Sequence, residues 1–376
     1  MKTLDECRVE IDAINKEMMR LFEQRMELSK QVVEYKIANN MEIFQPEREK
    51  IILENVKNNE EKEELKSYAV SFMSAIIDIS KDYQTDFLPQ EEMVVTLPKD
   101  FSRSLHVGYQ GVKGAFGEEA METYFGNEVQ ATNYPKFEDV FKALDKDEIK
   151  YGIIPIENSS TGAINDVYDL IRNYGFYIVG EQSISIAQHL LVVPGTKMEE
   201  IKEVYSHPQG LAQTTKFLDQ YPSIKRLPYP NTAVAAKMVS ECKDVSKAAI
   251  ASSKAAELYG LEILQANIHN EKTNHTRFIV IGKNLEAKKE NDTVSIVFTL
   301  KHEVGSLESI LKVIKDNGLN MTRIESRPIE ERNWEYYFYV DFEGNILDAQ
   351  VRRGLNKMKH FAQTFRILGT YQGTKC

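Results

Sequence analysis

Apolar residues in the first 88 positions recur at helical spacing. Residues 4–38 contain neither glycine nor proline, and their apolar side chains form two seven-residue ladders: Leu4, Ile11, Met18 and Val32, then Ile14, Leu21, Leu28 and Tyr35. The ladders predict one long helix with an apolar stripe. At about 1.5 Å per residue this helix measures about 50 Å, too long for one small domain to bury. We therefore expect partner helices, one beginning near Pro46 and one spanning 61–87.

Two cations interrupt the stripe. Arg25 occupies a position of the first ladder, and Lys36 points within about 20° of the same direction. One interpretation is that both reach solvent or pair with Glu42 or Glu49. The other is an anion-binding helical bundle, because burying an arginine without an anion is costly.

Further polar groups lie on the first and third helices. Ser80 and Gln84 are four residues apart and share a helix face. Arg8 points roughly 100° away from Arg25. One helix could not direct both arginines at one small ligand, whereas Arg8 of a second subunit could complete the site.

These residues resemble the all-helical chorismate mutases over roughly residues 1–88. The resemblance rests on positions from all three helices: Arg8, Arg25, Lys36, Arg48, Glu49, Ser80 and Gln84. It implies an intertwined dimer in which Arg25, Arg48 and Arg8 of the partner subunit surround the two substrate carboxylates, with help from Ser80.

The resemblance also implies how the rearrangement is accelerated. Lys36 and Gln84 would donate to the ether oxygen that gains charge, and Glu49 would hold the ring hydroxyl. Several relatives carry an acid where this chain has Gln45; the amide can still bind a hydroxyl, so we expect a reduced contribution there. A pericyclic reaction needs no nucleophile, so conformational restriction and preorganised charge carry the catalysis.

From Leu105 the pattern changes to alternating strands and helices. Strands are predicted at 105–109, 151–155, 184–193, 204–206, 248–251 and 277–281, and helices at 117–125, 163–172, 210–218 and 232–241. This predicts an α/β domain over 105–282 after a linker at 89–104. Ligands bind such folds at strand C-termini and helix N-termini.

Four polar loops occupy those places: the glycine loop at 108–114, PIENSSTG at 155–162, SHPQ at 206–209 with Gln213, and NHTRF at 274–278. Each alone has a plain explanation as a turn or a helix cap. Together with AAIAS at 248–252 and LYGL at 258–261, they closely resemble the prephenate dehydratases. That family's glycine loop often carries hydroxyls, whereas Gly114-Ala115-Phe116-Gly117 has none.

The resemblance implies two α/β lobes around a cleft, similar to periplasmic binding proteins. The residues it places in the cleft are Glu157, Asn158, Ser159, Ser206, Gln213, Thr276 and Arg277. Prephenate must lose CO₂ and its ring hydroxyl together, so the enzyme must supply a hydrogen-bond donor to the hydroxyl and a clamp for the side-chain carboxylate. We expect Thr276, polarised by Glu157, in the first role and Arg277 in the second.

Other chemistry is less supported in this domain. His189, His207 and His275 could donate protons, but no acid/base pair is visible around them. No spacing of His, Asp or Glu predicts a metal site, and we expect no cofactor.

The last domain, 291–372, reads as strand-helix-strand-strand-helix-strand, with strands at 292–300, 321–327, 334–342 and 363–369 and helices at 305–317 and 349–358. This order predicts a ferredoxin-like unit, which could simply stabilise or dimerise the chain. Its motif residues resemble the ACT domains of phenylalanine-regulated enzymes: Gly305, Ser306, Leu307, Asn320, Glu325, Ser326, Arg327 and Pro328. The resemblance implies that paired domains bind L-phenylalanine at their interface.

Composition narrows the function classes. The 47 Lys+Arg against 57 Asp+Glu give a net charge of −10, and no basic cluster supports nucleic-acid binding. Cys7, Cys242 and Cys376 are too far apart in sequence for a disulfide framework or a Cys-based zinc site. The start is charged, without a secretory signal, and no apolar run approaches the ~20 residues of a membrane span. We expect a cytoplasmic protein.

In order and length the three resemblances match the bifunctional chorismate mutase–prephenate dehydratases with a C-terminal ACT domain. The expected fold class is multidomain, α + α/β + α+β: helical bundle, two-lobed domain and ferredoxin-like domain. Expected ligands are chorismate, prephenate and feedback-inhibiting L-phenylalanine, in a homodimer or homotetramer. Two alternatives are a monofunctional dehydratase with a degenerate mutase domain and a non-catalytic aromatic-acid-binding regulator.

Overall fold

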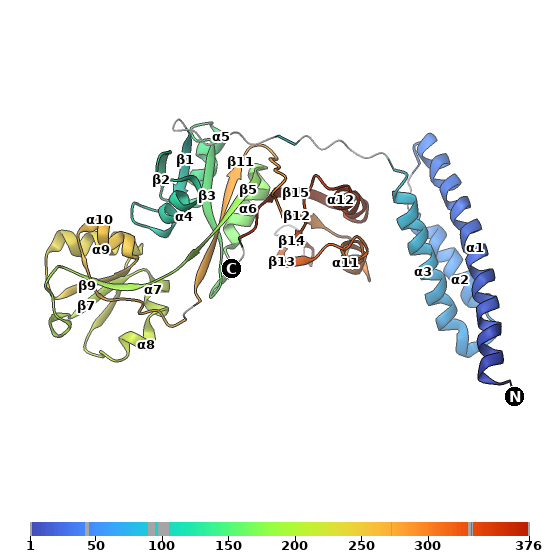
Figure 1. The fold of residues 1–376 in the computed structure, drawn as a ribbon, viewed down its shortest axis with the longest axis horizontal. Coiled ribbons are helices and arrows are strands. Elements are labelled where there is room, and N and C mark those ends of the chain that lie inside the picture. The colour runs from blue at the N-terminus through green and yellow to red at the C-terminus, as the bar shows by residue number, and fades with distance from the viewer. Residues whose placement is uncertain are drawn as a thin grey trace. The chain divides into compact units, whose positions relative to one another are not determined.

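The computed structural model describes residues 2–41, 45–88, 95–96, 105–271, 273–329, 332 and 334–374. Contacts divide the chain into two compact units, Met1–Met93 with Arg353–Phe361 and Val94–Arg352 with Ala362–Cys376 (Figure 1). Within the described ranges, no helix combines the length and apolarity needed to cross a bilayer.

The N-terminal region consists of α1 (Leu4–Ala38), α2 (Pro46–Asn59) and α3 (Lys66–Thr85), with a 3₁₀ turn, η1 (Glu63–Leu65), before α3. A capping box starts α1: the Glu6 amide donates to Thr3 Oγ1 at 3.3 Å, and the Thr3 amide donates to the Glu6 carboxylate at 2.8 Å. The long first helix and the start at Pro46 confirm the sequence pattern, while the third helix is shorter than predicted.

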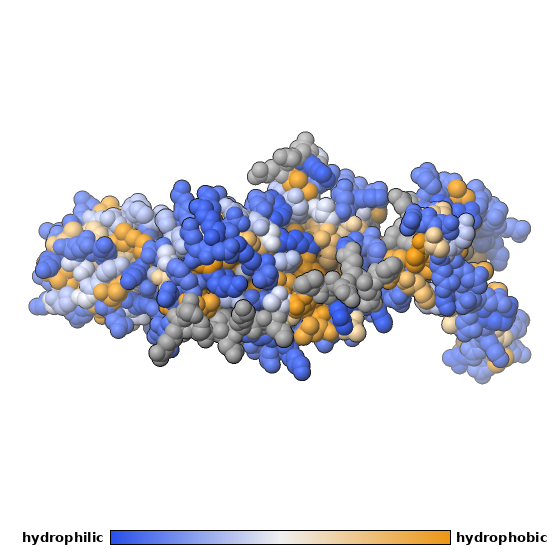
Figure 2. Space-filling model, turned by 90° about the horizontal axis from the view of Figure 1, so that it is seen from above, coloured by the Kyte–Doolittle hydropathy of each residue, from blue (hydrophilic) through white to orange (hydrophobic). Residues whose placement is uncertain are grey.

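The apolar stripe of α1 is not buried by the chain's own helices. Met26, Val33 and Ile77 are buried, yet every residue of both ladders is exposed, from 43% for Met18 to 67% for Leu4. Figure 2 shows apolar residues, in orange, among the polar ones on the surface of the N-terminal helices at the right of the view. Burying this stripe requires a surface that the described chain does not supply.

The first α/β lobe is built on β1 (His106–Gln110), β2 (Gln130–Tyr134), β3 (Tyr151–Asn158), β4 (Gly162–Ala163), β5 (Tyr177–Ser185) and β11 (His275–Gly282). Helix α4 (Phe116–Phe125) covers one face, packing on Ile153, and α5 (Phe137–Asp145) and α6 (Asn165–Tyr174) cover the other, packing on Ile154. Burial on both faces explains why β3 and β11 are continuous apolar runs.

The second lobe holds a five-stranded sheet in the order β10-β6-β9-β7-β8. Its strands are β6 (His189–Val192), β7 (Glu203–Ser206), β8 (Lys225–Pro228), β9 (Lys247–Ala251) and β10 (Glu262–Gln265). The lobe also contains η2 (Met198–Glu200), α7 (Pro208–Ala212), α8 (Thr215–Leu218), α9 (Thr232–Cys242) and α10 (Ser253–Tyr259).

Two predicted elements of this domain are wrong. The strand over 184–193 is two strands, because the chain leaves β5 at Ser185 and enters the second lobe at His189. The two crossings between the lobes lie side by side, with the Ile186 amide donating to the Asn274 carbonyl at 2.7 Å. The helix over 210–218 is two short helices, α7 and α8.

The C-terminal region has the predicted ferredoxin-like topology. Its elements are β12 (Thr293–Thr299), α11 (Ser306–Asp316), β13 (Met321–Pro328), β14 (Tyr336–Glu343), α12 (Ala349–Phe361) and β15 (Thr364–Tyr371), with strand order β13-β14-β12-β15. Strand β15 also pairs with β5, so the C-terminal strands and the strands of the first lobe form one ten-stranded sheet. The junction needs Gly369, since a Cβ there would lie 1.9 Å from the Ile178 carbonyl oxygen.

Candidate active sites

Arg25 reaches from α1 to α3 in the helical bundle. Its Nη1 donates to the Ser80 hydroxyl and to the Ile76 carbonyl at 3.4 Å. Burial lowers the pKa of Arg25, and none of the described carboxylates forms an ion pair with it. A half-buried guanidinium with only neutral partners is suited to an anionic ligand.

Lys36, Glu49 and Lys81 form the second polar group of the bundle. Burial lowers the pKa of Lys36, and the negative charge of Glu49 opposes that shift. Glu49 accepts from Lys81 Nζ at 3.0 Å, and Lys81 also pairs with Asp78 at 2.9 Å. Lys81, which binds one oxygen of the Glu49 carboxylate, was not predicted from the sequence. Glu42, the other predicted partner, lies outside the described residues.

The remaining predicted mutase residues are less engaged. Arg8 is exposed and pairs with Asp5 at 3.2 Å, and Arg48 and Gln45 are exposed, while Gln84 is half-buried. The described chain therefore assembles Arg25 with Ser80 and Lys36 with Glu49, and leaves Arg8 outside both groups.

Asn158 is the centre of the polar groups at the end of β3. Its Nδ2 donates to Thr276 Oγ1 and to Asn274 Oδ1, each at 2.9 Å. Its Oδ1 accepts from the amides of Ser160 and Thr161 at 3.1 and 3.2 Å. Among the described residues, the Thr276 hydroxyl accepts the Asn158 bond and donates none, so its proton is free for a ligand.

The loop after β3 meets the second lobe. Gln213 donates to the Ser160 hydroxyl and Gln209 to the Thr161 hydroxyl, both at 3.2 Å. Ser159 Oγ accepts from the His275 amide at 3.0 Å, which ties the loop to β11. The structure thus brings together four of the predicted cleft residues: Asn158, Ser159, Gln213 and Thr276. The sequence reading omitted Asn274, Ser160, Thr161 and Gln209, although it quoted the motifs that contain them.

Three predicted cleft residues point elsewhere. Consecutive residues of a strand face opposite sides, so Glu157 and Arg277 face away from Asn158 and Thr276. Glu157 binds Arg323 at 3.1 Å, and Arg277 binds Asp341 at 2.9 Å, both of the C-terminal region. Ser206 is fully buried and donates to the Ile250 carbonyl at 2.7 Å. Asn158, rather than Glu157, contacts the Thr276 hydroxyl.

The histidines near the lobes are structural acceptors. His207 Nδ1 accepts from the Gln209 amide at 3.2 Å and His189 Nδ1 from the Asn267 amide at 3.2 Å. Burial lowers the pKa of both, which favours the neutral acceptor form. In the described part of the chain, no group of three or more His, Cys, Asp or Glu is placed to hold a metal ion.

The predicted effector residues lie at the start of α11 and along β13. Gly305 has a positive φ of 86° and precedes α11, and Asn320, Ser326 and Pro328 are exposed. Arg327 is already engaged, because it binds Asp169 of α6 at 2.7 Å.

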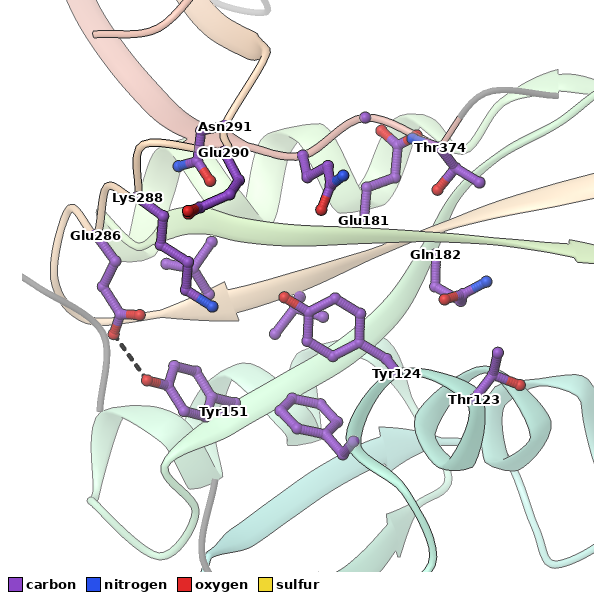
Figure 3. Close-up of a pocket in the computed structure, with 15 residues that line it drawn as sticks. Thr123, Tyr124, Tyr151, Glu181, Gln182, Glu286, Lys288, Glu290, Asn291 and Thr374 are labelled. Carbon is purple, nitrogen blue, oxygen red and sulfur yellow. Dashed lines mark hydrogen bonds between the residues drawn. The ribbon is translucent and has the colours of Figure 1, made fainter. Parts of the chain in front are cut away.

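Two cavities flank Glu181 in the α/β unit. One, of about 330 Å³, is lined by aromatic and charged side chains including Tyr124, Lys288 and Glu290, and the Tyr151 hydroxyl donates to Glu286 there at 2.8 Å (Figure 3). The other, of about 1020 Å³, lies between the first lobe and the C-terminal region and is lined by Arg277 and Asp341. The sequence reading anticipated neither.

Comparison with known proteins agrees with this architecture. Residues 107–286 match the family described as Prephenate dehydratase, and residues 7–85 match Chorismate mutase type II. A solved prephenate dehydratase from Arthrobacter aurescens, in complex with L-Phe, is 26% identical with a TM-score of 0.66, covering 72% of this chain and 90% of that one. GqqA, described as a novel type of quorum quenching acylase, is 27% identical with a TM-score of 0.66, covering 72% and 98%.

Fold and site thus define a prephenate dehydratase domain that follows a chorismate mutase bundle in the sequence. The bifunctional chorismate mutase/prephenate dehydratase of Aquifex aeolicus is 33% identical over 99% of this chain and 98% of its own length. The chain belongs to the bifunctional chorismate mutase/prephenate dehydratase family.

Proposed function

We propose that this chain converts chorismate to prephenate in its helical region and prephenate to phenylpyruvate in its two-lobed domain. The observation that carries the second activity is the Thr276 hydroxyl, held by Asn158 with its proton unused. Formation of phenylpyruvate from added prephenate tests it, and intact prephenate after prolonged incubation would overturn it.

In the mutase reaction, Arg25 binds a substrate carboxylate and Lys36 donates to the ether oxygen as the C–O bond breaks. The support is the half-buried Arg25, with which none of the described carboxylates forms an ion pair, and the negative charge of Glu49 that acts on Lys36. Arg48, Ser80 and Gln84 complete the proposed set, with Glu49 and Gln45 toward the ring hydroxyl. The protein orients the substrate and stabilises developing charge, and transfers no proton.

The mutase rate should therefore depend on the protonation of Lys36. The protonated amine stabilises the negative charge on the ether oxygen far better than the neutral amine does, so kcat/KM should fall as pH rises through the Lys36 pKa, which burial places below the ordinary lysine value. Glu49→Gln removes the opposing charge and should move this alkaline decline to lower pH. A pH–rate profile of each protein measures both, and an unchanged position of the decline in Glu49→Gln would contradict the assignment.

In the dehydratase reaction, the electrons of the breaking bond to the ring carboxylate enter the ring as CO₂ departs. The ring hydroxyl leaves at the same time and takes the Thr276 hydroxyl proton, forming water, and Thr276 recovers a proton from solvent. Thr276 donates the hydrogen bond to that hydroxyl, and accepting the Asn158 bond makes its O–H a stronger donor. Ser159 ties the loop after β3 to β11 beside the substrate, and Gln209 and Gln213 join that loop to the second lobe.

The exposed stripe of α1 supports a dimer with a shared mutase site. A second copy of the helix would bury the ladders, and Arg8, which is exposed and paired only weakly with Asp5, would be supplied across the interface.

Subunit mixing tests the shared site. Arg8→Ala and Lys36→Met chains should each lack mutase activity, whereas refolding them together should restore about a quarter of it, because half of the dimers are mixed and each has one intact site of two. Arg25→Ala mixed with Lys36→Met is the control and should restore nothing, since both groups come from one chain. No restoration in the first mixture would contradict Arg8 acting in trans.

The C-terminal region is proposed as an ACT domain that binds L-phenylalanine as a feedback inhibitor. Its ferredoxin-like topology and the L-Phe bound by the Arthrobacter dehydratase support this proposal. The effector residues are those named above from Gly305 to Pro328, with Arg327 engaged by Asp169 instead of free for ligand.

A further inference from the structure

Arg277 connects the strand that carries Thr276 to the C-terminal domain. It follows Thr276 directly on β11 and projects from the opposite face of the sheet, into the 1020 Å³ cavity. Its Nη2 donates to Asp341 Oδ2 of β14 at 2.9 Å and to the Tyr371 hydroxyl of β15 at 2.8 Å. Its Nε donates to Glu181 of β5, in the first lobe.

These groups form one hydrogen-bonded set, which we call the Arg277 cluster: Glu181, Arg277, Ser295, Asp341 and Tyr371. Arg277 Nη1 also lies 3.8 Å from Glu157 Oε2, at the edge of the cluster. Ser295 Oγ donates its one proton to Asp341 Oδ1 at 2.5 Å, so the contact of 2.7 Å between Ser295 and Tyr371 has the tyrosine as donor. Tyr371 in turn accepts from Arg277. Every hydroxyl proton is used, which fixes the guanidinium in one orientation.

The cluster is buried and charged. The side chains of Arg277, Asp341 and Glu181 are 19%, 13% and 7% exposed. Burial alone would lower the pKa of Arg277, but Tyr371, Asp341 and Glu181 raise it above its ordinary value. Glu181 is held at its other oxygen by the Thr374 amide at 3.0 Å. A partner removed from such a cluster leaves a buried charge uncompensated.

We propose that Arg277 is a positioning residue, through which the C-terminal domain sets the position of Thr276 and reduces dehydratase turnover when an amino acid binds. A shift of β14 or β15 moves Asp341 and Tyr371, and the guanidinium passes that shift to β11. The pairing between β11 and β3 shifts register between Arg277 and Phe278. Strand β11 is therefore irregular next to Arg277, where the proposal requires it to move. This inference rests on the proposed roles of Thr276 and L-phenylalanine.

A second ion pair across the same interface supplies the matched control. Arg327 of β13 binds Asp169 of α6 at 2.7 Å, with exposures of 21% and 29%. It joins the same two parts of the chain without touching β11. Asp341→Asn and Asp169→Asn therefore each remove one carboxylate charge from the interface, and only the first belongs to the Arg277 cluster.

The test measures prephenate turnover with and without L-phenylalanine in the full chain. Asp341→Asn should lower kcat about tenfold with KM nearly unchanged, because misplacing a catalytic group lowers rate more than binding. Inhibition at saturating L-phenylalanine should fall at least about fivefold, while calorimetry still detects L-phenylalanine binding. Asp169→Asn, measured without L-phenylalanine, should keep wild-type kcat, and Asp341→Glu should recover most of the lost kcat and inhibition.

Equal kcat and inhibition in Asp341→Asn and wild type would overturn the inference, and so would equal losses of kcat in Asp341→Asn and Asp169→Asn. Tyr371→Phe removes both hydrogen bonds of the Tyr371 hydroxyl, to Arg277 and Ser295, without changing charge, and it replaces Asp341→Asn if that variant fails to fold. Unchanged inhibition and kcat in Tyr371→Phe would also overturn the inference. Measurements on the wild-type chain distinguish failure of the proposed function from failure of the coupling through Arg277. If it is inactive or not inhibited, the proposed function fails; if it is active and inhibited and the variants match it, only the coupling fails.

Discussion

Thr276→Val should lower the kcat of the dehydratase reaction by about 10²-fold or more while leaving the mutase rate unchanged. Valine has nearly the same shape as threonine but has no proton to donate to the departing hydroxyl. Asn158 Nδ2 keeps Asn274 Oδ1 and the His275 carbonyl as acceptors, so the cost in stability should be about 1 kcal/mol. Phenylpyruvate formation from prephenate, followed spectroscopically, measures the effect.

Thr370→Val is the matched control for that variant. Thr370 is fully buried, and its hydroxyl has no partner among the described residues, so the same substitution should leave turnover unchanged and not lower the midpoint of thermal unfolding. If Thr276→Val retained wild-type kcat, Thr276 would not be the donor, and the free proton at the lobe junction would have no role in catalysis.

Lys36→Met should lower mutase kcat/KM by about 10²–10³-fold, the usual cost of removing one donor to a developing negative charge. Methionine keeps the length of the stem, so the packing of α1 should be preserved. Lys30→Met is the control, because Lys30 lies on the same helix, over the Phe87 ring at 5.6 Å, and has no proposed catalytic role.

The dehydratase rate of both lysine variants should equal that of the wild-type chain, since the two reactions use different regions. Loss of mutase activity in Lys30→Met of the same size as in Lys36→Met would show that any cation removed from α1 disables the bundle. The charge at Lys36 would then not be specific to the chemistry.

Much of the fold was predictable from local pattern. The α1 ladders, the start at Pro46 and the strand-helix order of the C-terminal region depend on spacing within one segment, and the structure has them. The strand predicted over 184–193 was wrong, because the segment runs through a crossing between the lobes and contains no glycine or proline that would mark the end of a strand. Only pairing with the other crossing, at Asn274, separates β5 from β6.

The sequence predicted which motifs form the candidate site, but not which way each side chain points from its strand. The motifs around Asn158 and Thr276 contained the right residues, and alternation along a strand already argued against placing Glu157 and Arg277 in the same cleft. What Arg277 does instead was not visible in sequence. Its partners Asp341 and Tyr371 lie 64 and 94 residues further along the chain, and they meet it only because β15 extends the dehydratase sheet.

The most direct test of the central claim is to incubate the full chain with chorismate and separate the products by chromatography, with and without L-phenylalanine. The account predicts that chorismate is consumed, that phenylpyruvate accumulates, and that L-phenylalanine diminishes the phenylpyruvate. Conversion of added prephenate without consumption of chorismate would contradict the mutase assignment, and failure to convert either compound would contradict the account as a whole.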